Sequence, residues 1–131
     1  MNTKIVMFSS AVFLFSAGII LTFLPTEVLT YFSLEAEKSS QLLCQLLGAQ
    51  YFAFGMINWN TKSSLIGGIY NRPIAVSNFA HFFIGGLALI KGITSYPSLP
   101  YALWVLASIY SVFAVLFGII MYNHPVRENK K

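Results

Sequence analysis

The sequence predicts an all-α membrane protein, an antiparallel bundle of four transmembrane helices with both termini in the cytoplasm. Four apolar stretches fill the chain, at roughly residues 5–24, 41–59, 73–93 and 100–122. Of all the acidic and basic side chains, only Lys91 lies inside one of these stretches, near its end. A helix of ~20 residues spans the ~30 Å hydrocarbon core of a bilayer. Each stretch is therefore long enough for one crossing.

The composition agrees with a membrane location. Hydrophobic residues make up 56% of the chain and charged residues only 9%, whereas about a quarter of the residues of a soluble domain are charged. A length of 131 residues leaves room for one bundle and for no separate soluble domain. The function therefore resides in the bundle or at its ends.

The basic residues indicate the orientation. Lys38 and Lys91 fall on one side of the predicted membrane, beside three of the glutamates, and the other six basic residues fall on the opposite side. The positive-inside rule places the richer side in the cytoplasm. Because these residues are not clustered on one face, the net charge of +4 does not indicate nucleic acid, and the lipid bilayer is the predicted partner. The six are Lys4, Lys62, Arg72, Arg127, Lys130 and Lys131.

The first predicted span covers about residues 5–24 and ends where Pro25 interrupts the helical hydrogen bonds. Its apolar run is longer than the ~7–15 residues of a secretory signal, so we expect it to be retained as a span. The following segment, residues 25–33, is too short to cross the membrane. It carries the aromatic pair Tyr31 and Phe32, which favours a position at the outer membrane interface.

The second predicted span covers about residues 38–60. Ser33 is a candidate N-cap, and Glu35 follows in the first turn, where a carboxylate complements the helix dipole. This pattern predicts a helix that begins in solvent near Leu34 and continues to Trp59. Tryptophan is enriched at membrane interfaces, so Trp59 is expected at the inner headgroup level.

The third and fourth predicted spans cover about residues 73–92 and 100–123. The turn between them is short, so they are expected to be antiparallel neighbours. Tyr101 and Tyr122 match an aromatic belt at each end of the fourth span. Residues 124–131 form a polar cytoplasmic tail. The first and fourth spans are interpreted mainly as lipid-facing scaffold.

Polar and small residues align on the third span. At ~100° per residue, a group that includes Asn78 and His81 falls within about one quarter of the helix, and an apolar group that includes Phe82 forms the remaining face, suited to lipid or aromatic packing. A polar side chain in hydrocarbon is costly without a partner, so the polar quarter is expected to face protein or a wet cavity. His81 is then either a titratable group in a functional site or a hydrogen-bonding link between helices.

The second span offers partners for this pair. Gln50 lies at a depth similar to that of His81, and Asn58 lies nearer the cytoplasmic end. Either amide is a candidate partner of Asn78 and His81, and the sequence does not choose between them. Gly48 and Gly55 lie two turns apart and form a groove that another helix or a ligand can enter.

The inner rim contributes one further candidate. Arg72 is a possible bidentate donor to an anionic head group, although a basic loop is also what the positive-inside rule predicts there. The candidate ligand-binding residues are therefore Gln50, Asn58, Asn78, His81 and Arg72.

No catalytic, metal or cofactor site is predicted. The chain has no Asp, its glutamates lie outside the spans, and no nucleophile occupies a recognisable motif. A lone histidine does not make a metal site, and Cys44, the single cysteine, is interpreted as an apolar filler. Gly67-Gly68 lacks the Lys-Ser/Thr of a phosphate loop. We therefore expect no metal and no cofactor, and favour a protein without enzymatic activity.

The stretch from Leu46 to Gly55, LLGAQYFAFG, joins a four-span layout and a first hairpin in which Leu24-Pro25 precedes an interfacial segment. In these features the chain resembles small bacterial membrane proteins of the DoxX-like group and related uncharacterised DUF-type families. The resemblance implies a four-helix bundle in a bacterial inner membrane. It carries over no functional residue.

Three functions stay open. The first is a binding or accessory module for a lipid-like or small apolar molecule, or for a larger membrane complex. The second is a small transporter or channel, which at this length would require a homo-oligomer. The third is a membrane enzyme that uses His81 as acid or base. A cavity that reaches His81 from the cytoplasm would favour the second or third function, and a packed His81 would favour the first.

Overall fold

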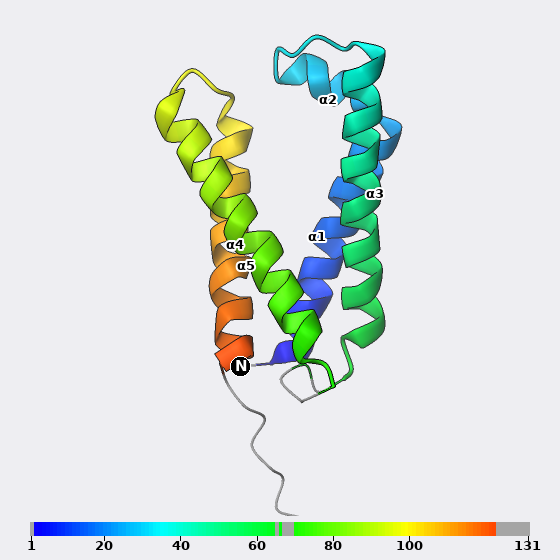
Figure 1. The fold of residues 1–131 in the computed structure, drawn as a ribbon, viewed down its shortest axis with the longest axis vertical. Coiled ribbons are helices and arrows are strands. Elements are labelled where there is room, and N and C mark those ends of the chain that lie inside the picture. The colour runs from blue at the N-terminus through cyan, green and yellow to red at the C-terminus, as the bar shows by residue number, and fades with distance from the viewer. Residues whose placement is uncertain (1, 65, 67–69, 123–131) are drawn as a thin grey trace, which may run out of the picture. The chain divides into compact units, whose positions relative to one another are not determined.

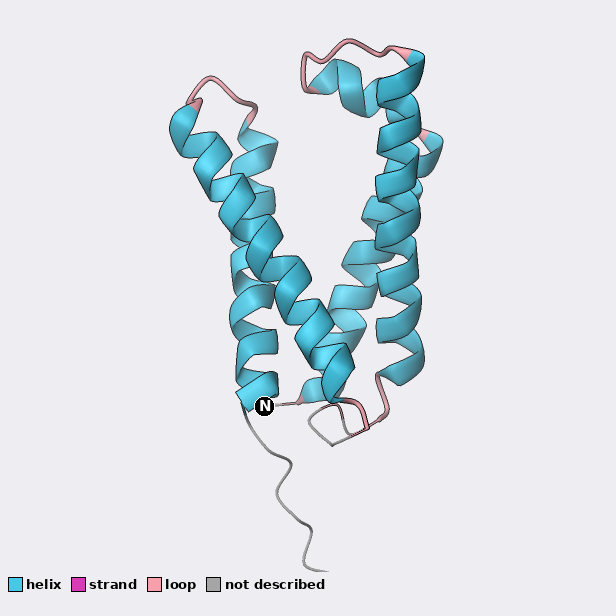
Figure 2. Cartoon of the chain, viewed as in Figure 1, coloured by secondary structure: helices cyan, strands magenta, loops and turns pink. Residues whose placement is uncertain are grey.

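The computed structural model describes residues 2–64, 66 and 70–122, and this part of the chain is all-helical (Figures 1 and 2). Three of its helices, the first and the last two, are long and apolar enough to cross a membrane. The prediction of an all-α, multi-pass membrane protein is confirmed to this extent. The helices are α1 (Thr3–Phe23), α2 (Pro25–Tyr31), α3 (Lys38–Thr61), α4 (Arg72–Ser95) and α5 (Tyr101–Tyr122).

The remaining long helix, α3, is as long as α4 but less apolar. Its run of leucines and aromatic residues is interrupted by Gln41, Gln45, Gln50 and Asn58, and it is not among the helices apolar enough to qualify as a span. A fourth crossing, and with it the four-helix bundle, therefore stays a prediction.

The chain divides into two compact units. Residues 7–62 form the α1–α3 unit, which contains α2, α3 and nearly all of α1. The other unit contains the first residues of α1 together with α4 and α5, and we call the latter two helices the α4–α5 hairpin.

In the α1–α3 unit the two long helices are antiparallel, and their backbones meet at two glycines. A Cβ atom on Gly18 would lie 2.9 Å from the carbonyl oxygen of Gly48, and a Cβ atom on Gly48 would lie 2.9 Å from the carbonyl oxygen of Gly18. Any side chain at either position would force the backbones apart. The groove predicted at Gly48 is thus occupied by α1.

The connection between α2 and α3 differs from its prediction. The N–H groups of Ser33 and Leu34 donate to the carbonyl oxygens of Thr30 and Leu29, each at 2.9 Å, and Ser33 has a φ of 57°. This pair of bonds around a left-handed residue is a Schellman motif, which ends a helix. Ser33 therefore closes α2, and the prediction that it caps a helix beginning near Leu34 is wrong; α3 begins at Lys38.

The α4–α5 hairpin is built around aromatic side chains. Phe82 is fully buried, and its ring stacks on those of Phe113 and Phe117, with centroids 4.8 and 5.7 Å away. Aromatic packing is one of the two roles predicted for the apolar face that includes Phe82, and Phe82 shows this role. The buried stripe of α4 runs through Ala75, Asn78, Phe82, Gly86 and Ile93, rotated from the predicted polar quarter.

Candidate functional site

His81 lies on α4, half-buried beside α5. The Tyr110 hydroxyl oxygen lies 3.3 Å from His81 Nε2, and either group can donate, depending on the histidine tautomer. Tyr110 is only 2% exposed. Gly85, one helical turn after His81, leaves room for the tyrosine, because a Cβ atom there would lie 2.6 Å from Tyr110 Cε1. The glycine lets the tyrosine ring lie across α4 and bring its hydroxyl group to the histidine.

The ring of Phe82 packs against both members of this pair. The Phe82 ring lies edge-on to both partners, with its centroid 5.0 Å from that of His81 and 5.2 Å from that of Tyr110. A hydrogen bond is stronger in such an apolar environment than in water. The hydrogen bond and the ring contacts join α4 to α5 at this position.

Asn78, one turn before Phe82, is completely buried. Its Nδ2 donates to the carbonyl oxygen of Ile74 at 2.9 Å, a bond within α4. Part of the hydrogen-bonding capacity of this amide is thus used by its own helix.

Asn58 is also completely buried. Its Nδ2 donates to Ser10 Oγ at 2.9 Å, and the Ser10 hydroxyl group donates to the carbonyl oxygen of Met7 at 3.0 Å. The bond from Asn58 to Ser10 joins α3 to α1, and the bond from Ser10 to Met7 lies within α1. They compensate for burying a polar serine and an amide between apolar helices.

The two other predicted site residues lie at the surface. Gln50 is exposed on α3, and Arg72 is exposed at the first position of α4. The predicted Gly67-Gly68 loop and the tail at residues 124–131 lie outside the described residues. Of the five candidate residues, therefore, the buried or half-buried ones are Asn58, Asn78 and His81.

Sequence reasoning missed Tyr110 and Ser10 as hydrogen-bonding partners. A tyrosine in the middle of an apolar span carries a hydroxyl group that needs a partner, and this signal was available at Tyr110. Ser10 gives no comparable signal, because a serine in a helix can bond to its own backbone. Among the described residues, no group of three or more His, Cys, Asp or Glu side chains is placed to hold a metal ion.

Comparison with known proteins adds no family to this description. No protein-family model, curated protein or solved structure matches the chain. The geometry of the helices and their polar residues is therefore the basis for a function.

Proposed function

We propose that this chain is a non-enzymatic, four-pass module of a bacterial inner membrane, which binds a lipid-like or small apolar molecule or docks onto a larger membrane complex. The observation that carries the proposal is the packing of His81, the strongest candidate for acid–base chemistry. Its Nε2 is engaged by Tyr110 and its ring is flanked by Phe82. A histidine held in this way fits a structural link better than a proton carrier or a general base.

The positions of the glutamates support the same proposal. Glu27 lies in α2, Glu35 and Glu37 precede α3, and all three are exposed. Ion-coupled carriers use ionisable residues within their spans, and the sequence places no carboxylate inside an apolar stretch. The resemblance to DoxX-like proteins supports the assignment to a bacterial inner membrane.

The packing of α3 against α1 supports a fourth crossing. Two ring pairs join the helices between their glycine contact and the N-terminal end of α1. These pairs are Phe8–Trp59 and Phe15–Phe52, with centroids 5.6 and 5.0 Å apart. Because α1 is apolar enough to span a membrane and α3 lies along it, α3 shares its depth. Gln45 Nε2 donates to the carbonyl oxygen of Thr22 at 3.3 Å, which lowers the cost of a glutamine inside the membrane.

Cysteine labelling tests this crossing and its direction. In a Cys44→Ser background, Glu37→Cys is expected to react with a membrane-impermeant maleimide in intact spheroplasts, because the positive-inside rule places that end of α3 outside. Lys62→Cys is expected to react only after the membrane is permeabilised. Labelling of both positions in intact spheroplasts would contradict a crossing by α3, and the reverse pattern would contradict only the orientation.

A double-mutant cycle tests the role of His81. His81→Phe and Tyr110→Phe are each expected to lower the free energy of unfolding in detergent by about 0.5–1.5 kcal/mol, the range of hydrogen bonds between membrane helices. The double variant is expected to lose little more than either single variant, because both remove the same bond. Tyr122→Phe, at a position 79% exposed, is the matched control and is expected to change nothing.

The same variants separate a structural from a functional histidine. If His81 is a structural link, His81→Phe retains the lipids and proteins that copurify with the wild-type protein. Loss of a copurifying molecule at unchanged stability would assign His81 to a ligand site, and strictly additive losses in the cycle would show that the two side chains do not interact.

A further inference from the structure

We propose that Trp59 and Lys62, at the end of α3, form a binding site for the phosphate of an anionic phospholipid whose acyl chain lies against Phe8 and Trp59. This inference deepens the proposed function by naming a ligand class, and it rests on the crossing of the membrane by α3. The site is distinct from the His81–Tyr110 pair of the α4–α5 hairpin.

The first support is an exposed aromatic surface. Trp59 lies in the last turn of α3, and its ring centroid lies 5.6 Å from that of Phe8 and 6.4 Å from that of Phe15 on α1. Trp59 remains 41% exposed and Phe8 46% exposed. Tryptophan at a helix end sits at the headgroup level of a bilayer. The two exposed rings therefore present an apolar surface to the lipid immediately beneath the headgroups.

The second support is the position of the Lys62 ammonium group. Lys62 Nζ lies 3.5 Å from the centroid of the Trp59 ring and 3.2 Å from the Trp59 carbonyl oxygen. The ring and the carbonyl dipole at the end of the helix both favour the positive charge there. Because an ammonium group has three N–H donors, its bond to the carbonyl group leaves donors for a phosphate oxygen.

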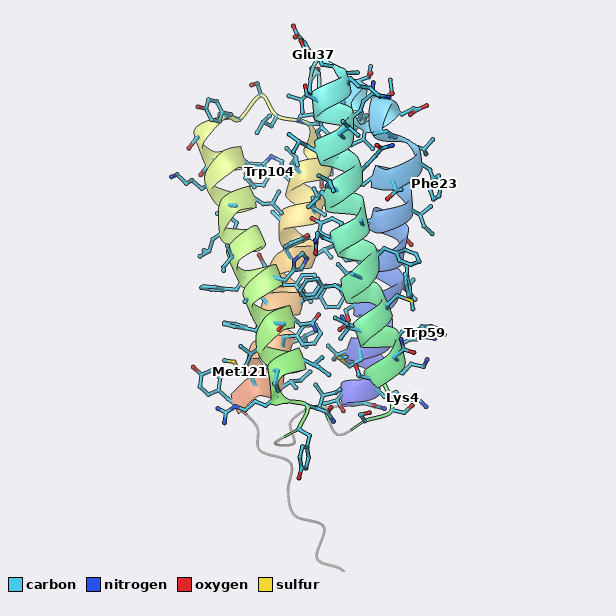
Figure 3. The ribbon with its side chains drawn as sticks, turned by 45° about the vertical axis from the view of Figure 1, so that its right-hand side comes forward. Lys4, Phe23, Glu37, Trp59, Trp104 and Met121 are labelled. Carbon is cyan, nitrogen blue, oxygen red and sulfur yellow. The ribbon has the colours of Figure 1, made fainter. Side chains whose placement is uncertain are left out.

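The third support is the distribution of charge along the α1–α3 unit. The three described glutamates lie at the other end of the helix pair from Trp59: Glu27 follows the C-terminus of α1, and Glu35 and Glu37 precede the N-terminus of α3. Figure 3 shows Glu37 and Trp59 at opposite ends of α3. A helix of this length separates its ends by roughly 35 Å, well beyond the ~8–10 Å Debye length. No carboxylate among the described residues of this unit therefore competes with a phosphate at Lys62.

Native mass spectrometry of the full chain, released from nanodiscs that contain equal amounts of phosphatidylglycerol and phosphatidylcholine, tests the site. The wild-type protein is expected to retain phosphatidylglycerol preferentially. Lys62→Gln is expected to lower that preference about ten-fold, because it removes a charge-assisted hydrogen bond to the phosphate, and Lys62→Arg is expected to preserve the preference. Lys38→Gln, at the first position of α3, is the matched control and is expected to leave the preference unchanged.

Three results would overturn the proposal. Equal retention of both lipids by the wild-type protein would remove the anionic preference, and equal losses in Lys62→Gln and Lys38→Gln would show that only net charge matters. Displacement of the lipid by millimolar inorganic phosphate or glycerol phosphate would identify a soluble phosphate ligand instead of a lipid. Cysteine labelling reports on the crossing of α3 independently, so a failed lipid site and a failed topology give different results.

Discussion

Replacing Gly48 by valine is expected to force α1 and α3 apart and to destabilise the protein by about 3 kcal/mol or more, the upper range for overpacking a close contact. Even the Cβ atom would lie 2.5 Å from Thr22 Oγ1 and 2.9 Å from both the Thr22 nitrogen and the Gly18 carbonyl oxygen. The hydroxyl group can rotate away, but the two backbone atoms move only with their helix. The loss is measured as the fall in melting temperature in detergent.

Gly92→Ala is the control for this substitution. A Cβ atom at Gly92, on α4, would meet no other atom within 4 Å. Because alanine favours a helix over glycine by up to about 1 kcal/mol, this variant is expected to be as stable as the wild-type protein or slightly more stable. If Gly48→Val melts at the same temperature as Gly92→Ala, the backbones of α1 and α3 do not meet at Gly48.

The apolar stretches predicted the long helices because the ends of these stretches coincide with residues that begin or end a helix. The fourth span, predicted at about residues 100–123, is α5 at Tyr101–Tyr122, preceded by Pro100. Ser33 shows where this reading fails. A Schellman motif favours glycine at its left-handed position, so a serine there looks like the N-cap of the next helix when the sequence alone is read.

The rotation of the helices was harder to predict than their positions. A membrane helix is apolar on the side that faces lipid as well as on the side that faces protein, so periodicity gives little contrast between the two. For this reason the sequence identified His81 and Asn78 as inward-facing candidates but did not decide whether Phe82 faces lipid or packs against aromatic side chains. It also left Tyr110 without a role, because α5 was interpreted as scaffold.

Because α4 is rotated so that Phe82 packs against α5, truncation of Phe82 is expected to destabilise the α4–α5 hairpin more than truncation of any other residue. Phe82 is fully buried and its ring contacts those of Phe113, Phe117, Tyr110 and His81. Phe82→Ala would leave a cavity among these rings. In a membrane the separated helices remain in an apolar solvent, so the loss comes mainly from packing. We expect the free energy of unfolding to fall by about 2–4 kcal/mol, since the cost of a cavity rises with its volume.

Phe83→Ala makes the same chemical change at the neighbouring position and is the matched control. Phe83 is 44% exposed and its ring stacks on that of Phe79 of the same helix, so its truncation is expected to cost less than about 1 kcal/mol. Unfolding of both variants in mixed micelles provides the comparison. Phe82→Ala should also weaken the coupling between His81 and Tyr110, because the ring that holds both side chains in place is gone. Equal losses in the two variants would mean that the aromatic core of the hairpin is not centred on Phe82.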